Sequence, residues 1–565
     1  MPWSTHEVFN QADDLVGYDL LATDAALGEA LARAGADWAA QPLGAYARRL
    51  GEAATYALAE QANRHVPQLH VFDARGRRID AVEYHPAWHE LLALYRAQGL
   101  VSLPLRDTRT GRWTAWAAGF YLHGQVEQGT LCPATMTTAA IPLLAREPAL
   151  WAAVQPGVWS DEHDPRDRPA AQKAGLWFGM GMTEKQGGSD LRTNATVATA
   201  VGAGGRGGEY LLRGHKWFFS VPAADAHLVV ARVGQGRGEG GPCACFYVPR
   251  WRPDGTKNAV LVQRLKDKVG NRSNASGEVE FHDAWGVLLG EEDRGIPTII
   301  EMATTTRLAC VLGSAAILRQ ATVQAIAYAR RRHAFGRALA DQPLMRTVLA
   351  DLALESEAAL VLAMRLARAF ERDADGTGGP VERAWKRLVT PAAKFWVCKR
   401  TVELTGEAME VFGGNGYVEP GVAARLFREA PVNSIWEGSG NVMCLDVLRG
   451  MAREPEAAEA LFTDLADAAS GAPVILAALK HLRLLLLHGP EELESLGRVL
   501  VQQLVLIAQA GLLRRHAPRA VADAFAAARF GTDDHHAPSR VAGAIDPRML
   551  DVAAILARAF PADAA

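Results

Sequence analysis

One glutamate lies in a stretch whose residue types suit proton chemistry. The segment NSIWEGSGN places Glu437 between a tryptophan and a run of small residues. A carboxylate beside an apolar ring, in a site that excludes water, has a raised pKa and can remove a proton from carbon. The alternative is an acid that caps a helix start or forms an ion pair near it. The segment therefore supports the hypothesis of a general base and leaves this structural alternative open.

A glycine-rich stretch, GMGMTEKQGGSD at residues 179–190, has the groups that a phosphate-containing ligand needs. Thr183 and Ser189 supply hydroxyls, and Gly187 and Gly188 let the backbone approach a ligand closely. The spacing lacks GxGxxG, so it does not indicate a Rossmann fold. A strand followed by a glycine turn is the alternative.

Three consecutive aromatic residues follow in GHKWFFS, residues 214–220. Side chains alternate along a strand, so the three rings cannot all face one core, and at least one should meet another domain or a planar ligand. Packing at a domain interface is the alternative. Further along, RRRHAFGR gathers four arginines, which suit bidentate binding of a pyrophosphate but also suit a solvated helix end.

Composition excludes several classes of protein. The chain has 565 residues, 49% of them apolar, and a net charge of −3, so it is neither disordered nor a polycation. Six scattered cysteines without a CxxC pair indicate reduced thiols and a cytoplasmic protein. The N-terminus predicts no signal peptide, and the apolar runs predict no membrane span. TDDHH at Thr532–His536 contains metal-ligand types, but we interpret it as a polar loop and expect no metal site.

The order of helical and β-prone segments along the chain predicts a multidomain α+β protein. Helical periodicity occupies residues 1–178, short β-prone segments occupy 179–285 as an antiparallel domain, and helices return over 286–450 as a bundle. Residues 451–565 form a further helical tail. Pro391 lies within a long helical pattern and predicts a kink or a break there.

These segments together resemble the acyl-CoA dehydrogenase family. The similar stretches are MTEKQGGSD, GHKWFFS, RLKDKVGNRSNASGEVEFHD, RHAFG, VFGGNGY and IWEGSGN, in the family's order and at about its spacing over roughly residues 100–450. The resemblance implies an N-terminal helical domain, a middle β-domain, a four-helix bundle, and FAD between the last two. It also implies a homo-oligomer, with a tetramer expected.

The resemblance assigns a role to each matched residue. It implies that Glu437 removes the α-proton of an acyl thioester while a hydride leaves the β-carbon for flavin N5. The residues implied to bind FAD are Met182, Thr183, Ser189, Phe218, Phe219, Ser220, Arg332, Gly414, Ile435, Trp436 and Asn441.

Some positions depart from the family pattern. TTTR keeps the arginine that serves CoA, Arg307, but has Thr304 where the family often has an aspartate. Glu410 replaces a glutamine, and the spacing to Gln342 is one residue short. These changes are compatible with flavin binding and put CoA binding in doubt. The dehydrogenase reading is the first hypothesis, and a DNA-binding flavoprotein with weak or vestigial dehydrogenase activity is the second.

The tail has a basic centre. Residues 480–530 contain seven lysines and arginines against four acids. One branch of the family, concerned with the response to DNA alkylation, implies non-specific and salt-sensitive binding of double-stranded DNA here. A solvated helix face is the alternative. The residues expected to contact DNA are Lys480, Arg483, Arg514, Arg515 and Arg519.

Overall fold

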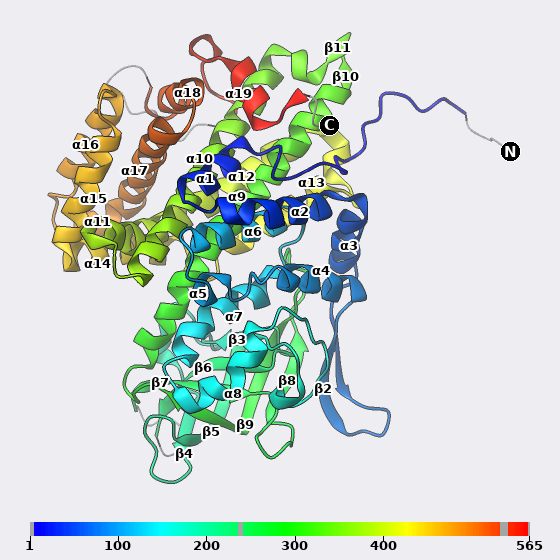
Figure 1. Ribbon diagram of the computed structural model, residues 1–565, viewed down its shortest axis with the longest axis vertical. Helices are drawn as coiled ribbons and strands as arrows, with labels where there is room; N and C mark the ends of the chain where they lie inside the picture. The colour runs from blue at the N-terminus through cyan, green and yellow to red at the C-terminus, as the bar shows by residue number, and fades with distance from the viewer. Residues whose placement is uncertain (1–4, 235–240, 532–540, 563–565) are drawn as a thin grey trace. The chain divides into compact units, whose positions relative to one another are not determined.

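The computed structural model describes residues 5–234, 241–531 and 541–562, and the chain divides into two compact units (Figure 1). The first unit combines Met1–Tyr56, Thr110–Val126 and Cys310–Ala565. The second combines Ala57–Arg109 and Glu127–Ala309. The region expected as an N-terminal helical domain therefore contributes segments to both units.

The second unit contains a β-barrel. Strands β6, β4, β5, β9 and β7 pair in that order, and β7 also pairs back with β6, so the ring closes. Strand β3 joins the ring along β6, and β8 joins along β9. The pairs β3–β6 and β4–β6 are parallel, so the expected antiparallel domain is antiparallel only in part. The strands are β3 (Phe178–Gly181), β4 (Val197–Ala200), β5 (Glu209–Ser220), β6 (Ala226–Val233), β7 (Cys243–Pro249), β8 (Val260–Leu265) and β9 (Ser276–Leu289).

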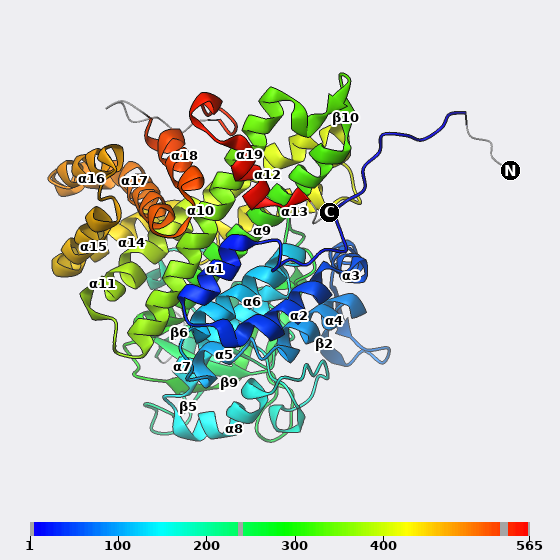
Figure 2. The same ribbon diagram turned by 45° about the horizontal axis from the view of Figure 1, so that its top comes forward.

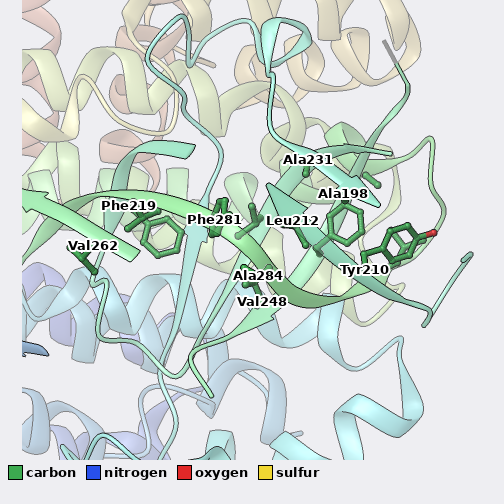
Figure 3. Close-up of a cluster of buried hydrophobic side chains, with 14 residues drawn as sticks. Ala198, Tyr210, Leu212, Phe219, Ala231, Val248, Val262, Phe281 and Ala284 are labelled. Atoms are coloured by element: carbon green, nitrogen blue, oxygen red, sulfur yellow. The ribbon is translucent and has the colours of Figure 1, made fainter. Parts of the chain in front are cut away.

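Alternation along these strands fills the barrel core. Figure 3 shows the ring of Phe219 among buried side chains that include Leu212, Phe281 and Tyr210. These side chains are spaced so that they point to one face of their strands, and burying that face stabilises the barrel.

Helices and one hairpin complete the second unit. The hairpin pairs β1 (Gln68–Phe72) with β2 (Arg78–Glu83), in a region expected to be wholly helical. Its short strands follow a helix, and the helical periodicity of the neighbouring segments concealed them. The helices are α3 (Ala53–Arg64), whose start belongs to the first unit, α4 (Pro86–Ala97), α5 (Leu103–Arg106), α7 (Leu131–Leu144) and α8 (Pro148–Trp159).

Long helices form the first unit, as expected for a bundle. Helix α6 (Arg112–Val126) is buried on all sides and packs on α10 (Pro343–Ala374), which explains its apolar character all round. The other helices here are α1 (Ala25–Arg33), α2 (Ala40–Gly51), α9 (Gly295–Arg331) from Cys310 onward, α11 (Gly379–Ala384), α12 (Thr390–Val411), α13 (Val422–Asn433) and α14 (Gly440–Arg453). A short hairpin, β10 (His333–Ala334) with β11 (Arg337–Ala338), follows α9.

A π-helical turn marks the position where Pro391 predicts a kink. The turn covers Trp385–Val389, between α11 and α12, and Pro391 lies in the first turn of α12. Proline cannot donate to the carbonyl four residues earlier and clashes with it, so the wider turn accommodates the ring.

The tail adds helices to the first unit. Helices α15, α16, α17 and α18 pack against one another, and α17 also packs on α10, α12 and α14 (Figures 1 and 2). The tail helices are α15 (Pro455–Ala468), α16 (Pro473–Leu485), α17 (Pro490–His516), α18 (Arg519–Phe530) and α19 (Val552–Ala559).

Within the residues that the structure describes, two helices, α9 and α17, are long and apolar enough to cross a membrane by length and composition. The apolar window of α9 is wholly buried in protein, and 72% of that of α17 is buried. Core helices of globular proteins pass the same test, so the burial accounts for their composition.

Candidate active site

Two glycines on strand β3 let the strand pack closely against the aromatic rings of neighbouring strands. A Cβ on Gly179 would lie 2.2 Å from the ring of His227, and one on Gly181 would lie 2.8 Å from the ring of Phe219. His227 is buried, stacks on Phe219, and its Nε2 donates to the Ser220 carbonyl at 3.0 Å. Burial lowers the pKa of His227 to about 3, so the ring is neutral.

A buried ion pair fixes the loop that follows β3. The Lys216 ammonium on β5 donates to Glu184 Oε1 at 2.7 Å and to the Met182 carbonyl at 3.3 Å. Glu184 also accepts from the backbone N–H groups of Ala195 and Thr196. Burial alone would raise the pKa of Glu184, but Lys216 and these hydrogen bonds lower it to about 2. The pair therefore ties Met182 to β5.

A β-bulge decides where the three aromatic rings point. Lys216 pairs with Val279 and Phe219 with Gly277, so two residues of β5 stand opposite one residue of β9. Phe219 is 1% exposed and belongs to the barrel core, whereas Phe218 is 53% exposed. Alternation turns the Phe219 ring into the barrel core, so the cofactor contact expected at Phe219 would come from its backbone. Phe218 presents the accessible ring.

A lysine covers the exposed aromatic rings. The Lys266 ammonium lies 3.5 Å from the Trp217 ring centroid and 4.5 Å from that of Phe218. It also pairs with Glu278 at 2.7 Å. A planar ligand on this face of Phe218 would have to share the face with Lys266 or displace it.

The remaining groups of this loop fit a flavin nucleotide. Ser189 is exposed, and Thr183 and Ser220 are half-buried. A Cβ on Gly188 would lie 2.8 Å from Thr183 Oγ1, so the glycine lets the loop lie against that hydroxyl. Three hydroxyls and one accessible aromatic face match a planar ring joined to phosphate groups.

Arg307, the expected substrate residue, is buried on α9. Thr304, at the departure from the family pattern, donates its hydroxyl to the Ile300 carbonyl at 3.0 Å, within the helix. The Thr304 hydroxyl thus forms its hydrogen bond with the backbone of its own helix, as hydroxyls in helices often do. Nothing in this geometry assigns a ligand to Arg307.

In the first unit, Glu437 lies on the turn between α13 and α14. Its backbone adopts φ 60°, a left-handed conformation that costs a non-glycine residue about 1–3 kcal/mol. Trp436 and Glu437 are half-buried, and Ile435 is exposed. Glu437 follows the end of α13 and precedes α14, whose N-cap position is Ser439.

The arginine-rich segment ends α9 and continues into the β10–β11 hairpin. Arg332 donates to the Asn10 carbonyl, and the Asn10 side chain bonds the backbone N–H and C=O of His333, each at 2.8 Å. Gly414, on the 3₁₀ turn after α12, faces open space at its Cβ position. The N-terminal residues therefore hold the hairpin that carries Arg332.

Asn441, also expected at the flavin, has a partner from the tail. Its Oδ1 accepts from Arg498 Nε of α17 at 2.8 Å. The sequence offered no signal for this contact, because the two residues are 57 positions apart.

The residues expected to contact DNA are largely engaged within the protein. Lys480 is exposed. Arg514 donates to the Ser470 carbonyl at 2.8 Å. The other three form ion pairs at 2.9 Å: Arg483 with Glu459, Arg515 with Asp464, and Arg519 with Asp523. Thr532–His536 lies outside the described residues.

Comparison with protein families and relatives agrees with this arrangement. Residues 10–165 match the adaptive response protein AidB N-terminal domain. Residues 179–284 match the acyl-CoA dehydrogenase middle domain, and residues 293–452 match the acyl-CoA dehydrogenase C-terminal domain.

Individual relatives extend the match over nearly the whole chain. The AidB protein of Escherichia coli (strain K12) is 46% identical over 527 residues, which cover 93% of this chain and 94% of that protein. The structure of Caenorhabditis elegans ACDH-11 in complex with C11-CoA aligns with a TM-score of 0.81 at 25% identity, over 93% of this chain and 92% of that one. A Bacillus anthracis acyl-CoA dehydrogenase complexed with FAD shares the fold, with a TM-score of 0.60 at 19% identity over 78% and 77% of the two chains. FAD is the cofactor typical of these enzymes, and the chain belongs to the acyl-CoA dehydrogenase family of oxidoreductases, with a similarity to AidB that covers nearly its whole length.

Proposed function

We propose that this protein is an FAD-dependent dehydrogenase that oxidises the Cα–Cβ bond of an acyl thioester, with Glu437 as the base. The β3 loop and Phe218 bind the flavin, and Trp436 supplies apolar surroundings for the carboxylate. The ACDH-11 relative, whose structure holds C11-CoA, supports a thioester as the substrate class.

The observation that carries this proposal is the conformation of Glu437. A glutamate held in the left-handed region, beside a half-buried tryptophan, has a strained backbone, and such strain clusters at active sites. Glu437 lies on a short turn between α13 and α14, and the turn restricts the direction in which its side chain leaves the backbone. Such restriction is what a base needs in order to reach one carbon-bound proton.

The reaction balances as follows. The Cα–H bond breaks and its proton goes to the Glu437 carboxylate, while the electron pair forms the new Cα=Cβ bond. The Cβ–H bond breaks and its hydrogen leaves with two electrons. FAD supplies the acceptor for this hydride when bound.

An anaerobic titration tests this function. Acyl-CoAs of increasing chain length are added to the purified holoprotein, and the visible absorbance of the flavin is followed. Acyl-CoAs of one range of chain lengths should bleach this absorbance in proportion to the amount added. Glu437→Gln removes the base, so it should slow bleaching by about 10²–10⁴-fold while retaining FAD. Flavin that stays oxidised with every thioester would contradict the proposal.

Self-association is the second part of the proposal. Phe335 is 98% exposed on the β10–β11 hairpin, and Phe9, Leu344 and Tyr417 are also exposed. Asn10 bonds to the hairpin and Gln11 bonds to Asn415, so these apolar residues gather on neighbouring segments of the first unit. An apolar surface of this kind favours a homo-oligomer, and Phe335→Asp should lower the mass measured by light scattering.

Duplex DNA association is an alternative function, favoured by the likeness to AidB. Because three of the tail arginines form ion pairs with carboxylates, we expect weak, non-specific binding that falls steeply with salt. Retention of duplex DNA in 50 mM and 200 mM salt, compared with a variant in which Arg514, Arg515 and Arg519 are all alanine, measures this. Equal retention by the triple variant would remove the tail from this function.

A further inference from the structure

A lysine inside the bundle holds the turn that carries Glu437. Lys394 lies on α12 and is 0% exposed. Its ammonium donates to the carbonyl of Trp436 at 2.6 Å and also to the carbonyl of Gly438. These two carbonyls flank Glu437 on either side, so the lysine binds the turn across the glutamate itself.

This arrangement explains how a left-handed glutamate persists. The carbonyls of Trp436 and Gly438 both face Lys394 inside the bundle, and carbonyls that are out of water need donors. One ammonium group supplies donors to both carbonyls, and hydrogen bonds from a charged donor are stronger than neutral ones. The lysine therefore offsets the strain of the turn at the position where the strain occurs.

The charges of Lys394 and Glu437 both act on the thiol of Cys310. Cys310 on α9 is buried, and burial is the main reason that the pKa of its thiol is raised. The ammonium of Lys394 opposes that rise, the charge of Glu437 adds to it, and Trp436 contacts the thiol. Cys310 is therefore near enough to Lys394, Glu437 and Trp436 to interact with all three.

We propose that Lys394 is a positioning residue that fixes the direction of the Glu437 carboxylate from inside the bundle. The inference rests on the proposed role of Glu437 as base, and it adds the residue that acts through that base. Lys394 touches neither substrate nor cofactor in this account. Its effect passes through the carbonyls of Trp436 and Gly438.

Lys394→Met tests the inference, since methionine is of similar length and has neither charge nor donor. Lys386→Met is the matched control. Lys386 belongs to the same helical run, in the π-helical turn, and its ammonium pairs with Asp373 at 2.6 Å on a part-exposed surface. Each variant removes one lysine and its polar contacts, but only the first releases the Glu437 turn.

The first measurement does not depend on flavin chemistry. In flavin-free protein, N-ethylmaleimide labelling of Cys310, followed by peptide mass spectrometry, reports how often the turn opens above the thiol. Lys394→Met should raise the labelling rate about tenfold, whereas Lys386→Met should leave it unchanged. Equal labelling rates in the two variants would overturn the inference.

The second measurement uses the holoprotein and a reducing acyl-CoA in stopped flow. Lys394→Met should slow flavin reduction about 100-fold while the thioester dissociation constant changes less than about threefold, because the base is displaced and the binding groups are not. In a Glu437→Gln background the same change should have no further effect. A further slowing in that background would show that Lys394 acts independently of Glu437 and would contradict the inference.

The two failures are distinguishable. If no thioester reduces the wild-type flavin, the proposed function fails, and the labelling of Cys310 alone decides whether Lys394 holds the turn. If Lys394→Met does not unfold cooperatively, Lys394→Gln replaces it, because glutamine keeps a donor without the charge. That variant should label faster than wild type, and labelling at the wild-type rate would overturn the inference.

Discussion

Two buried lysines, one in each compact unit, hold the turns that carry the candidate site residues, and they differ in what balances their charge. Lys216 faces the Glu184 carboxylate at 2.7 Å, and the neighbouring backbone satisfies the rest of that carboxylate. Lys394 faces the carbonyls of Trp436 and Gly438. The first lysine faces a carboxylate inside the fold, whereas the second donates to two backbone carbonyls.

This difference in charge balance gives Lys216 a structural role and gives Lys394 an influence on the proposed reaction. A neutral buried pair contributes mainly to the geometry of its loop, and its charge is cancelled at short range. An ammonium bound to carbonyls keeps its field, which acts on groups nearby, as the effect on the Cys310 thiol shows. We therefore expect loss of Lys216 to affect folding most and loss of Lys394 to affect catalysis most.

The largest expected change in stability comes from Lys216→Met. It leaves Glu184 as a buried carboxylate without its cation, which should cost about 3–5 kcal/mol of unfolding free energy in urea titrations. The double variant with Glu184→Gln should recover part of that loss, because no buried charge remains. If the single variant is no less stable than the double variant, the pair is not balanced as described.

The next effect tests how tightly the β3 strand is packed. Gly179→Ala places a methyl group against the His227 ring and should destabilise the protein by about 1–3 kcal/mol. Gly414→Ala is the matched control in the other unit, because its Cβ would meet open space. Thermal unfolding of the two variants should therefore differ clearly, and equal midpoints would contradict the close approach at β3.

Acid should weaken the second unit through His227. Its folded-state pKa is about 3 against 6.5 for an unhindered histidine, so its contribution is fully present above pH 6.5 and is lost as the pH falls towards 3. Between pH 7.5 and pH 5 the loss from this one group should be about 2 kcal/mol. His227→Gln keeps a donor for the Ser220 carbonyl and should flatten this slope. An unchanged slope would assign the acid sensitivity to other groups.

The smallest effect is expected at Lys266. Its ammonium lies over two aromatic rings and beside Glu278, at a partly exposed position. Lys266→Met should change the unfolding free energy by about 0.5–1 kcal/mol, the usual size of an exposed cation–π contact. FAD retention after gel filtration should persist. Loss of the flavin would show that Lys266 binds the cofactor directly.

Local patterns predicted much of the fold. The spacing of apolar residues located α10, the short β-prone segments located the barrel strands, and Pro391 marked the π-helical turn. The pairing that closes the barrel, β6 with β7 beside β7 with β9, joins strands through contacts that no local pattern contains. The β1–β2 hairpin was missed because its strands are short and its neighbours are helical.

The candidate site shows the same limit residue by residue. The segment around Glu437 was recognisable from its residue types, and alternation required that the aromatic rings of β5 diverge. Which ring turns outward depends on the bulge opposite Glu278, a register shift that only the paired strands reveal. Lys394 is 42 and 44 positions from the carbonyls that it binds, and nothing in its own surroundings in the chain distinguishes it.

Proton exchange at the substrate α-carbon tests the central claim most directly. A thioester that has α-hydrogens but no β-hydrogens cannot lose a hydride, so its α-exchange into D₂O, followed by NMR with the holoprotein, isolates the base. We predict exchange in the wild-type protein. In Glu437→Gln with FAD still bound, the exchange rate should fall by at least about 100-fold. Exchange at the wild-type rate in that variant would show that another group removes the proton.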